Sequence, residues 1–525
     1  MSHALQLPCD VAAIQSGHAA DRPAGRGVWI LAATIVGSSM AFIDGTVVSV
    51  ALPSMGKDLG ASAADLQWVV EAYSLFLSAL LLVGGALGDR FGRKRIFGAG
   101  IALFALASLA CALAPSMALL ILARAAQGVG GALLVPGSLA LISASFDAGE
   151  RGRAIGTWSA WSGITTALGP LVGGWLVSLS WRWAFLLNLP LALVVLLLLT
   201  RVPESKNPHA RALDPFGAGL ATLGLGGIVY GLIESSRRGF GDPAVVAALV
   251  LGIAALVAFL VVESRLPAPM LPLALFRSRA FLGANLVTFF LYGALATVFL
   301  FLPLDLIEVQ GYTPFSAGAA ILPLIVILFA LSRAAGAAVD RVGPRVLLIA
   351  GPTLAAAGFC ALSLPGVGGA YARTFLPGLL ILGFGLAASV APLTTTVMGS
   401  ASEENAGIAS GVNNAVSRAA GLIAIAALGI LLTTTFDRGL ERRLAALGLA
   451  PQTTSAVMAQ KERLAALVPP PGSPAEPIHR AALESFADGF RFVARASAML
   501  ALLAAASAWI WIPGSARRPQ PRGTS

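Results

Sequence analysis

The chain has 525 residues, of which 57% are hydrophobic and only 11% are charged, and its formal net charge is +10. Soluble domains carry about a quarter charged residues, so this composition excludes an ordinary soluble protein and predicts an all-α, polytopic membrane protein embedded in a lipid bilayer. Most of the basic residues lie in short segments between apolar runs. The positive charge is therefore no evidence for a nucleic-acid-binding surface, and no nucleic-acid partner is expected.

Motifs for soluble chemistry are missing from the sequence. Cys9, Cys111 and Cys360 show no spacing typical of a metal or redox site. The sequence has no nucleotide-binding Gly-Lys-Ser/Thr loop, no metal-spaced group of histidines or cysteines, and no nucleophile with a plausible base. We therefore predict that the protein is not an enzyme, needs no cofactor or metal, and takes its energy from an ion gradient.

Apolar windows along the chain predict about fourteen membrane-spanning helices, each close to the ~20 residues that cross a bilayer. An even number of spans places both termini on the same side of the membrane. In chain order the predicted spans are 28–50, 66–87, 96–114, 117–144, 153–179, 183–200, 215–234, 243–263, 281–303, 315–338, 345–365, 373–398, 405–433 and 487–512.

Linkers divide these spans into two bundles of six helices with an extra pair between them. The pair at 215–263 is flanked by linkers that contain proline and charged residues, and removing it leaves a six-plus-six arrangement. The predicted parts are a cytoplasmic tail at 1–27, a first bundle at 28–200, an inserted pair with its linkers at 201–280, a second bundle at 281–512 and a basic cytoplasmic tail at 513–525. Within the second bundle, 434–485 is expected to be a long external loop with a short amphipathic helix around 437–449.

The short loop Gly85–Arg95, which reads G-A-L-G-D-R-F-G-R-K-R, determines the predicted orientation. Short loops rich in Lys and Arg stay in the cytoplasm, so this loop and both termini are predicted to be cytoplasmic, in a cell inner membrane. The stretch Gly336–Arg345 repeats the pattern, as expected for two halves related as a parallel repeat. Asp89 is expected to cap a helix or pair with a neighbouring arginine and so stabilise one closed conformation. The loop residues predicted to control conformational change are Gly85, Gly88, Asp89, Arg90, Gly92, Arg93, Asp340 and Arg341.

Asp44, Glu71 and Arg124 are charged residues within the first, second and fourth predicted spans. A charge in the membrane interior is costly, so such residues usually face a cavity and serve a function. At 1.5 Å per residue all three lie roughly 8–10 Å below the external surface, in one layer. An arginine that approaches or leaves a carboxylate switches it between proton-releasing and proton-holding states. These residues are therefore proton-coupling candidates, and the alternative is a static ion pair that holds helices together.

Polar residues in the second bundle form a weaker candidate site. Asn413, Asn414 and Arg418 lie near the middle of the span 405–433. Polar side chains there either bind substrate or join helices, and the sequence leaves both roles open.

Several stretches, in this order along the chain, resemble the motifs of one family. The chain resembles the major facilitator superfamily, in its fourteen-span drug:proton antiporter branch, over nearly its whole length. The stretches are Asp44–Pro53, Gly85–Arg95, Arg124–Gly131 and Gly163–Gly174, with support from Trp181–Pro190 and Gly407–Gly421. The resemblance implies the major facilitator fold, with two six-helix bundles related as a repeat plus two extra central helices.

The stretch Gly163–Gly174 resembles the fifth-span motif that the family associates with antiporters rather than symporters. Pro170 removes a backbone donor and kinks the helix, and small residues allow close helix packing. The resemblance implies that this packing seals a path through which protons would otherwise leak. The residues concerned are Gly163, Gly169, Pro170, Gly173 and Gly174.

The prediction is a proton-coupled antiporter that exports amphipathic small molecules, cationic ones included, by alternating access, as in drug efflux. Its expected partners are protons, the substrate and the lipid bilayer. Whether a periplasmic adaptor and an outer-membrane channel take part cannot be read from the sequence. Three alternatives stay open: an importer or facilitator of a polar metabolite, a non-transporting membrane sensor or scaffold, and a membrane enzyme acting on lipid, for which a catalytic constellation is missing.

Overall fold

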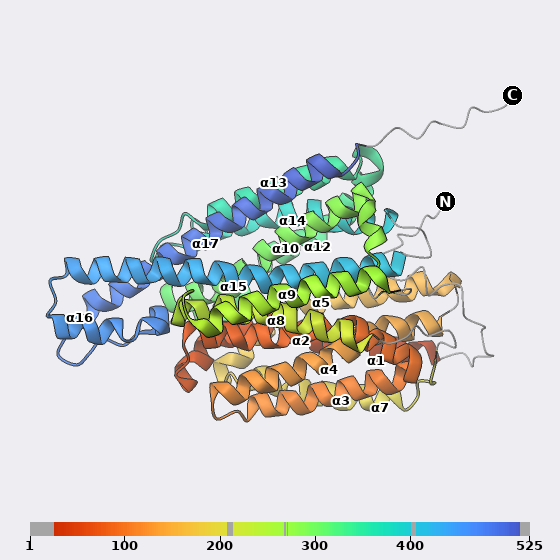
Figure 1. Ribbon diagram of the computed structural model, residues 1–525, viewed down its shortest axis with the longest axis horizontal. Coiled ribbons are helices and arrows are strands. Elements are labelled where there is room, and N and C mark those ends of the chain that lie inside the picture. The colour runs from red at the N-terminus through yellow and green to blue at the C-terminus, as the bar shows by residue number, and fades with distance from the viewer. Residues whose placement is uncertain are drawn as a thin grey trace.

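The computed structural model describes residues 26–146, 148–206, 214–266, 269, 271–400 and 406–514, and this part of the chain is helical along most of its length (Figure 1). The long helices run side by side as an elongated bundle. Their bounds are α1 Arg26–Leu59, α2 Ala63–Phe91, α3 Arg93–Ala112, α4 Met117–Ser145, α5 Ala148–Leu179, α6 Trp183–Leu186, α7 Asn188–Leu199, α8 Pro215–Arg238, α9 Pro243–Arg265, η2 Leu273–Arg277, α10 Arg279–Leu304, η3 Asp305–Val309, α11 Pro314–Ala320, α12 Leu322–Val342, α13 Pro344–Leu362, α14 Phe375–Gly399, α15 Ala406–Ala446, α16 Pro451–Met458, η5 Lys461–Ala466 and α17 Ala475–Trp511.

Helix length and hydropathy confirm a multi-pass membrane protein. Within the described residues, eleven helices are long and apolar enough to cross a bilayer, and α2, which bends by 51°, makes twelve. Each predicted span coincides with a helix or a broken helix. The remaining two, α5 and the α6–α7 pair, are apolar over shorter lengths, so the count of fourteen crossing helices stays a prediction.

Helix packing confirms the predicted repeat of two six-helix bundles. In the first bundle α4 packs against α2 and α3, α1 packs against α5 and α7, and α3 packs against α7. In the second bundle α14 packs against α12 and α13, α10 packs against α15 and α17, and α13 packs against α17. The two sets of contacts match pair for pair, with α11 and α12 together taking the place of α2.

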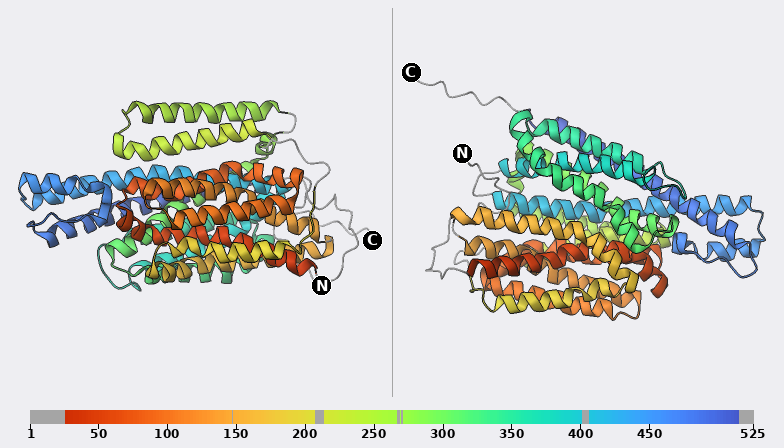
Figure 2. Two further views of the ribbon diagram at one scale, coloured as in Figure 1. Left: turned by 90° about the horizontal axis from the view of Figure 1, so that it is seen from below. Right: turned by 180° about the vertical axis from the view of Figure 1, so that it is seen from behind.

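The extra helices α8 and α9 form an antiparallel hairpin on one side of the bundle (Figure 2, left). Asp214 begins α8 by accepting a hydrogen bond from the Gly217 N–H, and Asp242 begins α9 in the same way. Only α8 meets the rest of the protein extensively, and it packs against both α2 and α15. The hairpin therefore covers the line of contact between the two bundles that is formed by α2 and α15.

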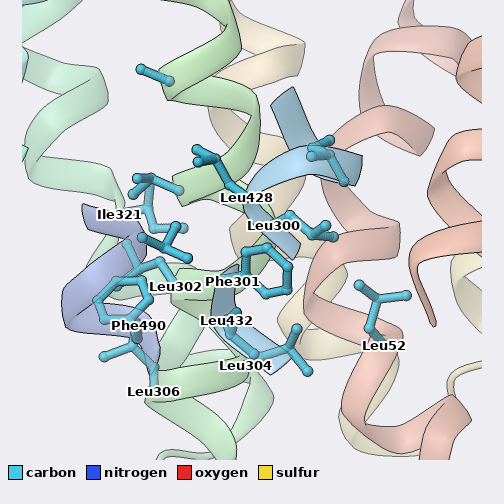
Figure 3. Close-up of a cluster of buried hydrophobic side chains, with 14 of the residues drawn as sticks. Leu52, Leu300, Phe301, Leu302, Leu304, Leu306, Ile321, Leu428, Leu432 and Phe490 are labelled. Carbon is cyan, nitrogen blue, oxygen red and sulfur yellow. The ribbon is translucent and has the colours of Figure 1, made fainter. Parts of the chain in front are cut away.

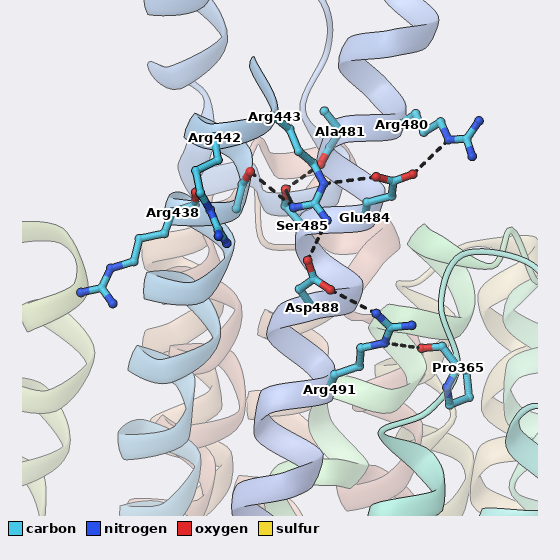
Figure 4. Close-up of polar contacts among 11 residues, drawn as sticks. Pro365, Arg438, Arg442, Arg443, Arg480, Ala481, Glu484, Ser485, Asp488 and Arg491 are labelled. Carbon is cyan, nitrogen blue, oxygen red and sulfur yellow. Dashed lines mark hydrogen bonds and ion pairs between the residues drawn. The ribbon is translucent and has the colours of Figure 1, made fainter. Parts of the chain in front are cut away.

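The segment 434–485, predicted as a loop with one short helix around 437–449, is mostly helical, while its external location stays a prediction. α15 continues to Ala446 and α17 begins at Ala475, so both helices extend well beyond the predicted spans. The apolar windows end where charges begin, but here the charges pair with each other (Figure 4). Arg443 of α15 donates to Glu484 and Asp488 of α17 at 3.1 and 2.7 Å. We call residues 447–474, which join these two helices, the cap; they include α16 and η5.

The two bundles meet closely at the end of the molecule that carries the cap. A side chain at Gly174 of α5 would collide with the backbone of Pro314, and one at Gly318 of α11 would collide with the carbonyl of Pro170. Leu52 of α1 and Phe301 of α10 belong to one apolar cluster there (Figure 3). The described ends of the chain, residues 26 and 514, lie at the opposite end (Figure 1).

Gly318→Leu should prevent the α5–α11 contact, because its side chain has no room beside the Pro170 carbonyl. We expect a lower thermal unfolding midpoint and loss of transport. Gly219→Leu is the matched control, because a side chain there meets nothing within 4 Å. Both quantities can be measured on purified protein in detergent and in proteoliposomes. Equal behaviour of the two variants would show that the close α5–α11 contact is dispensable.

Candidate functional site

A buried ion pair joins the first and fourth helices. The guanidinium Nη1 of Arg124 donates to Asp44 Oδ2 at 2.6 Å, and both side chains are at most 1% exposed. Gln127 completes the group, because its Nε2 donates to Asp44 Oδ1 at 2.8 Å while its Oε1 accepts from Arg124 Nη1 at 2.7 Å. Each carboxylate oxygen of Asp44 therefore has a donor.

A second layer of contacts holds this group in place. Arg124 Nε donates to the Val69 carbonyl of α2 at 2.9 Å, and its guanidinium lies 4.3 Å from the centre of the Tyr73 ring. Gln127 also donates to Ser108 Oγ of α3 at 3.0 Å, and this oxygen accepts from Asn188 of α7 at 3.2 Å. Helices α1, α2 and α4 thus hold the two charges directly, α3 contacts them through Gln127, and α7 is connected through Ser108 and Gln127.

The sequence of α4 explains why these groups can meet. Arg124 and Gln127 are three residues apart, so they lie on the same face of the helix. The glycines that follow let the neighbouring helices approach: a side chain at Gly128 would collide with the Tyr73 carbonyl of α2, and one at Gly130 would lie 2.7 Å from the Phe104 amide of α3.

Glu71 does not belong to the ion-paired group. Its side chain is fully buried, and neither carboxylate oxygen has a hydrogen-bond partner among the described residues. α2, the helix that carries Glu71, supports Arg124 through the Val69 backbone and the Tyr73 ring instead. The structure therefore brings together two of the three residues predicted to share a layer, and adds Gln127.

The basic loop between α2 and α3 is a tight turn at Gly92. This residue has φ +118°, a conformation that favours glycine, and its N–H donates to the Gly88 carbonyl. Asp89 pairs with Arg93 one turn later at 2.8 Å, as expected for a stabilising contact at a helix junction. Glu204, which the sequence analysis missed, accepts from the Lys94 and Arg95 amides and so caps α3.

Other predicted loop residues have less defined surroundings. Gly85 faces Pro136 of α4, and Arg90 lies over the Phe91 ring. The corresponding turn of the second bundle is at Gly343, which has φ +81° and thus matches Gly92. Arg341 is exposed at the end of α12, while the side chain of Asp340 lies outside the described part of the structure.

The small residues of α5 pack against two helices. A side chain at Gly169 would collide with Thr46 of α1, one at Gly173 would lie 3.0 Å from Val47 of the same helix, and Gly174 faces α11 of the other bundle. Pro170 lies inside the helix, between these contacts. Gly163 is helical, and its surroundings lie outside the description.

The polar residues of α15 separate into different roles. Asn413 donates to Thr288 and Asn285 of α10 at 2.6 and 3.2 Å, so it joins two helices of the same bundle. Asn414 is exposed. Arg418 is half-buried, and its helix packs against α2 of the first bundle.

The arrangement holds the charges of Asp44 and Arg124 together away from solvent. Protonation of Asp44 would cancel its charge and weaken its attraction for Arg124. Among the described residues, no group of three or more His, Cys, Asp or Glu side chains is placed to hold a metal ion.

Gln127 carries a sequence signal, namely a polar side chain one turn from a buried arginine. Glu204 has none, since it lies more than a hundred residues from its partners.

Comparison with known proteins agrees with this fold. The family model of the Major Facilitator Superfamily matches residues 34–425. Puromycin resistance protein pur8 of Streptomyces alboniger is 39% identical over 439 residues, which cover 82% of this chain and 85% of that protein. The Tetracenomycin C resistance and export protein of Streptomyces glaucescens is 32% identical over 499 residues, 92% of this chain and 91% of that protein.

A solved structure extends the comparison to the fold. The inward-facing, unoccupied structure of a bacterial homolog to the human lysosomal transporter Spinster superimposes with a TM-score of 0.66 at 17% identity, covering 93% of this chain and 98% of that one. At this identity the likeness concerns the fold alone. Together with the family match and the relatives, it shows that the chain belongs to the Major Facilitator Superfamily.

Proposed function

We propose that this protein is a proton-coupled antiporter that exports amphipathic small molecules by alternating access, in a cell inner membrane. The relatives described above are named for resistance to, or export of, antibiotics, which supports export over import of a polar metabolite. The single observation that carries the proton-coupled part is the buried Asp44–Arg124 pair.

The pair can act as a switch because it is buried, so that a change in the charge of either side chain has a large energetic cost. A buried ion pair is costly to break from one side, on the order of 3–5 kcal/mol, since the remaining charge is left uncompensated. A proton arriving at Asp44 removes one charge of the pair, so Arg124 must then find other partners or move. The Val69 carbonyl and the Gln127 amide oxygen already accept from Arg124. We propose that this change in partners is coupled to the relative movement of the two bundles.

The loop Gly85–Arg95 and the packing of α5 would control that movement. The Asp89–Arg93 pair and the Glu204 cap fix the junction of α2 and α3, and α2 carries the Val69 and Tyr73 contacts to Arg124. The contacts of α5 with α1 and α11 would exclude water from the cap end while the pair exchanges its proton. In the proposed orientation the basic loop and both termini are cytoplasmic and the cap is external.

Asp44→Asn should abolish uphill export, because the amide keeps the size of the side chain but cannot carry a proton. It should also lower stability, since Arg124 stays buried without its counter-charge. The double variant Asp44→Asn/Arg124→Gln removes both charges and should recover stability without recovering coupling. Substrate-driven proton movement in proteoliposomes and thermal unfolding provide the two measurements. Undiminished coupling in the double variant would identify the pair as a static support.

Asp89→Ala should slow transport while substrate affinity stays within a few-fold, because Asp89 holds a helix junction away from the ion-paired group. Glu204→Gln should act in the same direction, since it weakens the cap of α3. Transport rates and equilibrium binding are compared in the same preparations. Collapse of affinity with normal turnover would place Asp89 in the binding site instead.

Labelling of single cysteines in intact cells tests the proposed orientation. With Cys9 and Cys360 replaced by serine and Cys111 buried, Ala475→Cys, directly after the cap, should react with a membrane-impermeant maleimide, and Lys206→Cys should react only after the cells are opened. Both positions are exposed in the structure. The reverse pattern would invert the topology.

A further inference from the structure

The cap, which joins two helices of the second bundle, also contacts the first bundle. Its helix η5 packs against α15 and α17 of the second bundle and against α2 of the first. Two ion pairs hold η5 in place: Lys461 pairs with Asp437 of α15 at 2.8 Å, and Glu462 pairs with Arg237 at the end of α8 at 3.6 Å. The cap therefore connects both bundles and the extra hairpin at one end of the molecule.

Leu464 of η5 has a backbone conformation that leucine rarely adopts. Its φ is +53° and its ψ is −130°, and among the described residues no other non-glycine residue has a positive φ. Glycine takes such a conformation at little steric cost, whereas other residues hold it only where the surrounding structure enforces it, often at functional sites. The Leu464 side chain is 7% exposed and belongs to an apolar cluster with members from both bundles. Its presence at a position suited to glycine indicates that this side chain is needed between the bundles.

A cavity of about 360 Å³, within the range of small-molecule sites, lies between the bundles and is lined in part by Leu464. The charged groups that line it are Lys57 of α1 and Glu308 of η3, which pair across the bundles at 3.0 Å, and the exposed Arg463. Apolar side chains from both bundles complete the wall, namely Pro53, Leu66, Leu304 and Phe486. A largely apolar wall with a few polar groups suits an amphipathic molecule with an aromatic or branched apolar body.

An apolar layer bounds this cavity on the side of the buried ion pair. Pro53 of the cavity wall follows Asp44 by nine residues on α1, which corresponds to about 13 Å along the helix. Leu52 precedes Pro53, and Phe301 lies one turn before Leu304 of the wall; both belong to one buried apolar cluster (Figure 3). The cavity is therefore a separate compartment between the ion pair and the cap end of the molecule.

The start of α2 and the cap meet at the edge of this compartment. Ala63 of α2 and Leu464 line the cavity and also line a smaller one beside η5, α8 and α15. The two residues thus lie on the wall that divides the cavities, where the cap reaches the first bundle. Separation of η5 from α2 would open this wall.

We propose that this cavity is a release site, which the exported amphipathic molecule occupies after it leaves the centre of the protein, and that Leu464 is the lid that closes the site. The inference rests on the proposed function and adds a second binding site to it. The exported molecule is the occupant because the walls belong to the interface between the bundles, which alternating access has to open. Movement of the bundles apart at the cap end would withdraw Leu464 from α2 and break the Lys57–Glu308 pair.

Protection of a single cysteine from a membrane-impermeant maleimide tests the release site. The reporter is Ala63→Cys in purified protein in which Cys9 and Cys360 are replaced by serine. Saturating N-phenyl-1-naphthylamine, a neutral aromatic probe, should slow the reaction of Ala63→Cys several-fold. Ala475→Cys, an exposed position directly after the cap, is the control and should react at an unchanged rate. Equal reaction of Ala63→Cys with and without the probe would remove the site.

Filling the cavity provides a second test of the same site. Ala466 lines the cavity, so Ala466→Phe should occupy its space and abolish protection by the probe. Ala456→Phe is the matched control, because Ala456 is an exposed residue of α16 in the same cap, and it should leave protection intact. Thermal unfolding midpoints show whether each variant is folded. Full protection in a folded Ala466→Phe variant would place the probe elsewhere.

Glycine at position 464 separates the lid from the stability of the cap. Leu464→Gly removes the side chain and suits the positive φ, so its unfolding midpoint should be higher than that of Leu464→Ala, which keeps the unfavourable conformation. Without the probe, Leu464→Gly should make Ala63→Cys react several-fold faster. Leu447→Gly, at an exposed leucine of the same cap, should leave that rate unchanged. An unchanged rate in Leu464→Gly would show that Leu464 does not close the cavity.

Transport of the same probe in proteoliposomes distinguishes this proposal from the proton-coupled one. Ala466→Phe should slow export of N-phenyl-1-naphthylamine, and Ala456→Phe should not. Protection of Ala63→Cys together with export that moves no protons would refute antiport and leave the release site standing. Proton-coupled export of the probe without protection of Ala63→Cys, and at an undiminished rate in Ala466→Phe, would refute the release site and leave antiport standing.

Discussion

The ion pair between Asp44 and Arg124 is the interaction on which the first bundle depends. Two charges within a membrane protein are tolerable only when every donor and acceptor around them is used. Here Gln127 bonds to both partners, and the Val69 carbonyl accepts from Nε of the guanidinium. Helices α1, α2 and α4 are thereby joined at the ion pair, and a change in the charge of the pair alters contacts of all three helices.

Close backbone packing complements this polar centre. Gly128 and Gly130 bring α4 against α2 and α3, and Gly174 and Gly318 bring α5 against α11 of the other bundle. In a membrane, where apolar side chains gain little by leaving lipid, such contacts supply much of the helix association. The first set fixes the geometry around the ion pair within one bundle, while the second joins the two bundles. Gly174 of α5 thus belongs to the interface between the bundles, and the glycines of α4 belong to the interior of one bundle.

The sequence was sufficient for the fold class, the repeat and the pairing of Asp44 with Arg124, because hydropathy, loop charge and the cost of a buried charge are local signals. It was insufficient for 434–485, since a hydropathy window cannot recognise that Arg443 and Glu484 will neutralise each other across two helices. Glu71 shows the limit of depth arguments: residues at one level of a bilayer can point to different neighbours. Glu204 shows the limit of motif arguments, because its partners, Lys94 and Arg95, are close only in the folded chain.

The α8–α9 hairpin makes the two flanks of the molecule unequal. The bundles meet along two lines, one between α2 and α15 and one where α5 meets α11 and α12, and α8 packs over the first of these. Along that flank a hydrophobic molecule dissolved in the bilayer faces a helical wall, with the lipid-facing helix α9 outside it. The extra pair thus makes the two flanks of a nearly symmetric repeat different, so that any lateral exchange with the lipid phase is directed to the α5 side.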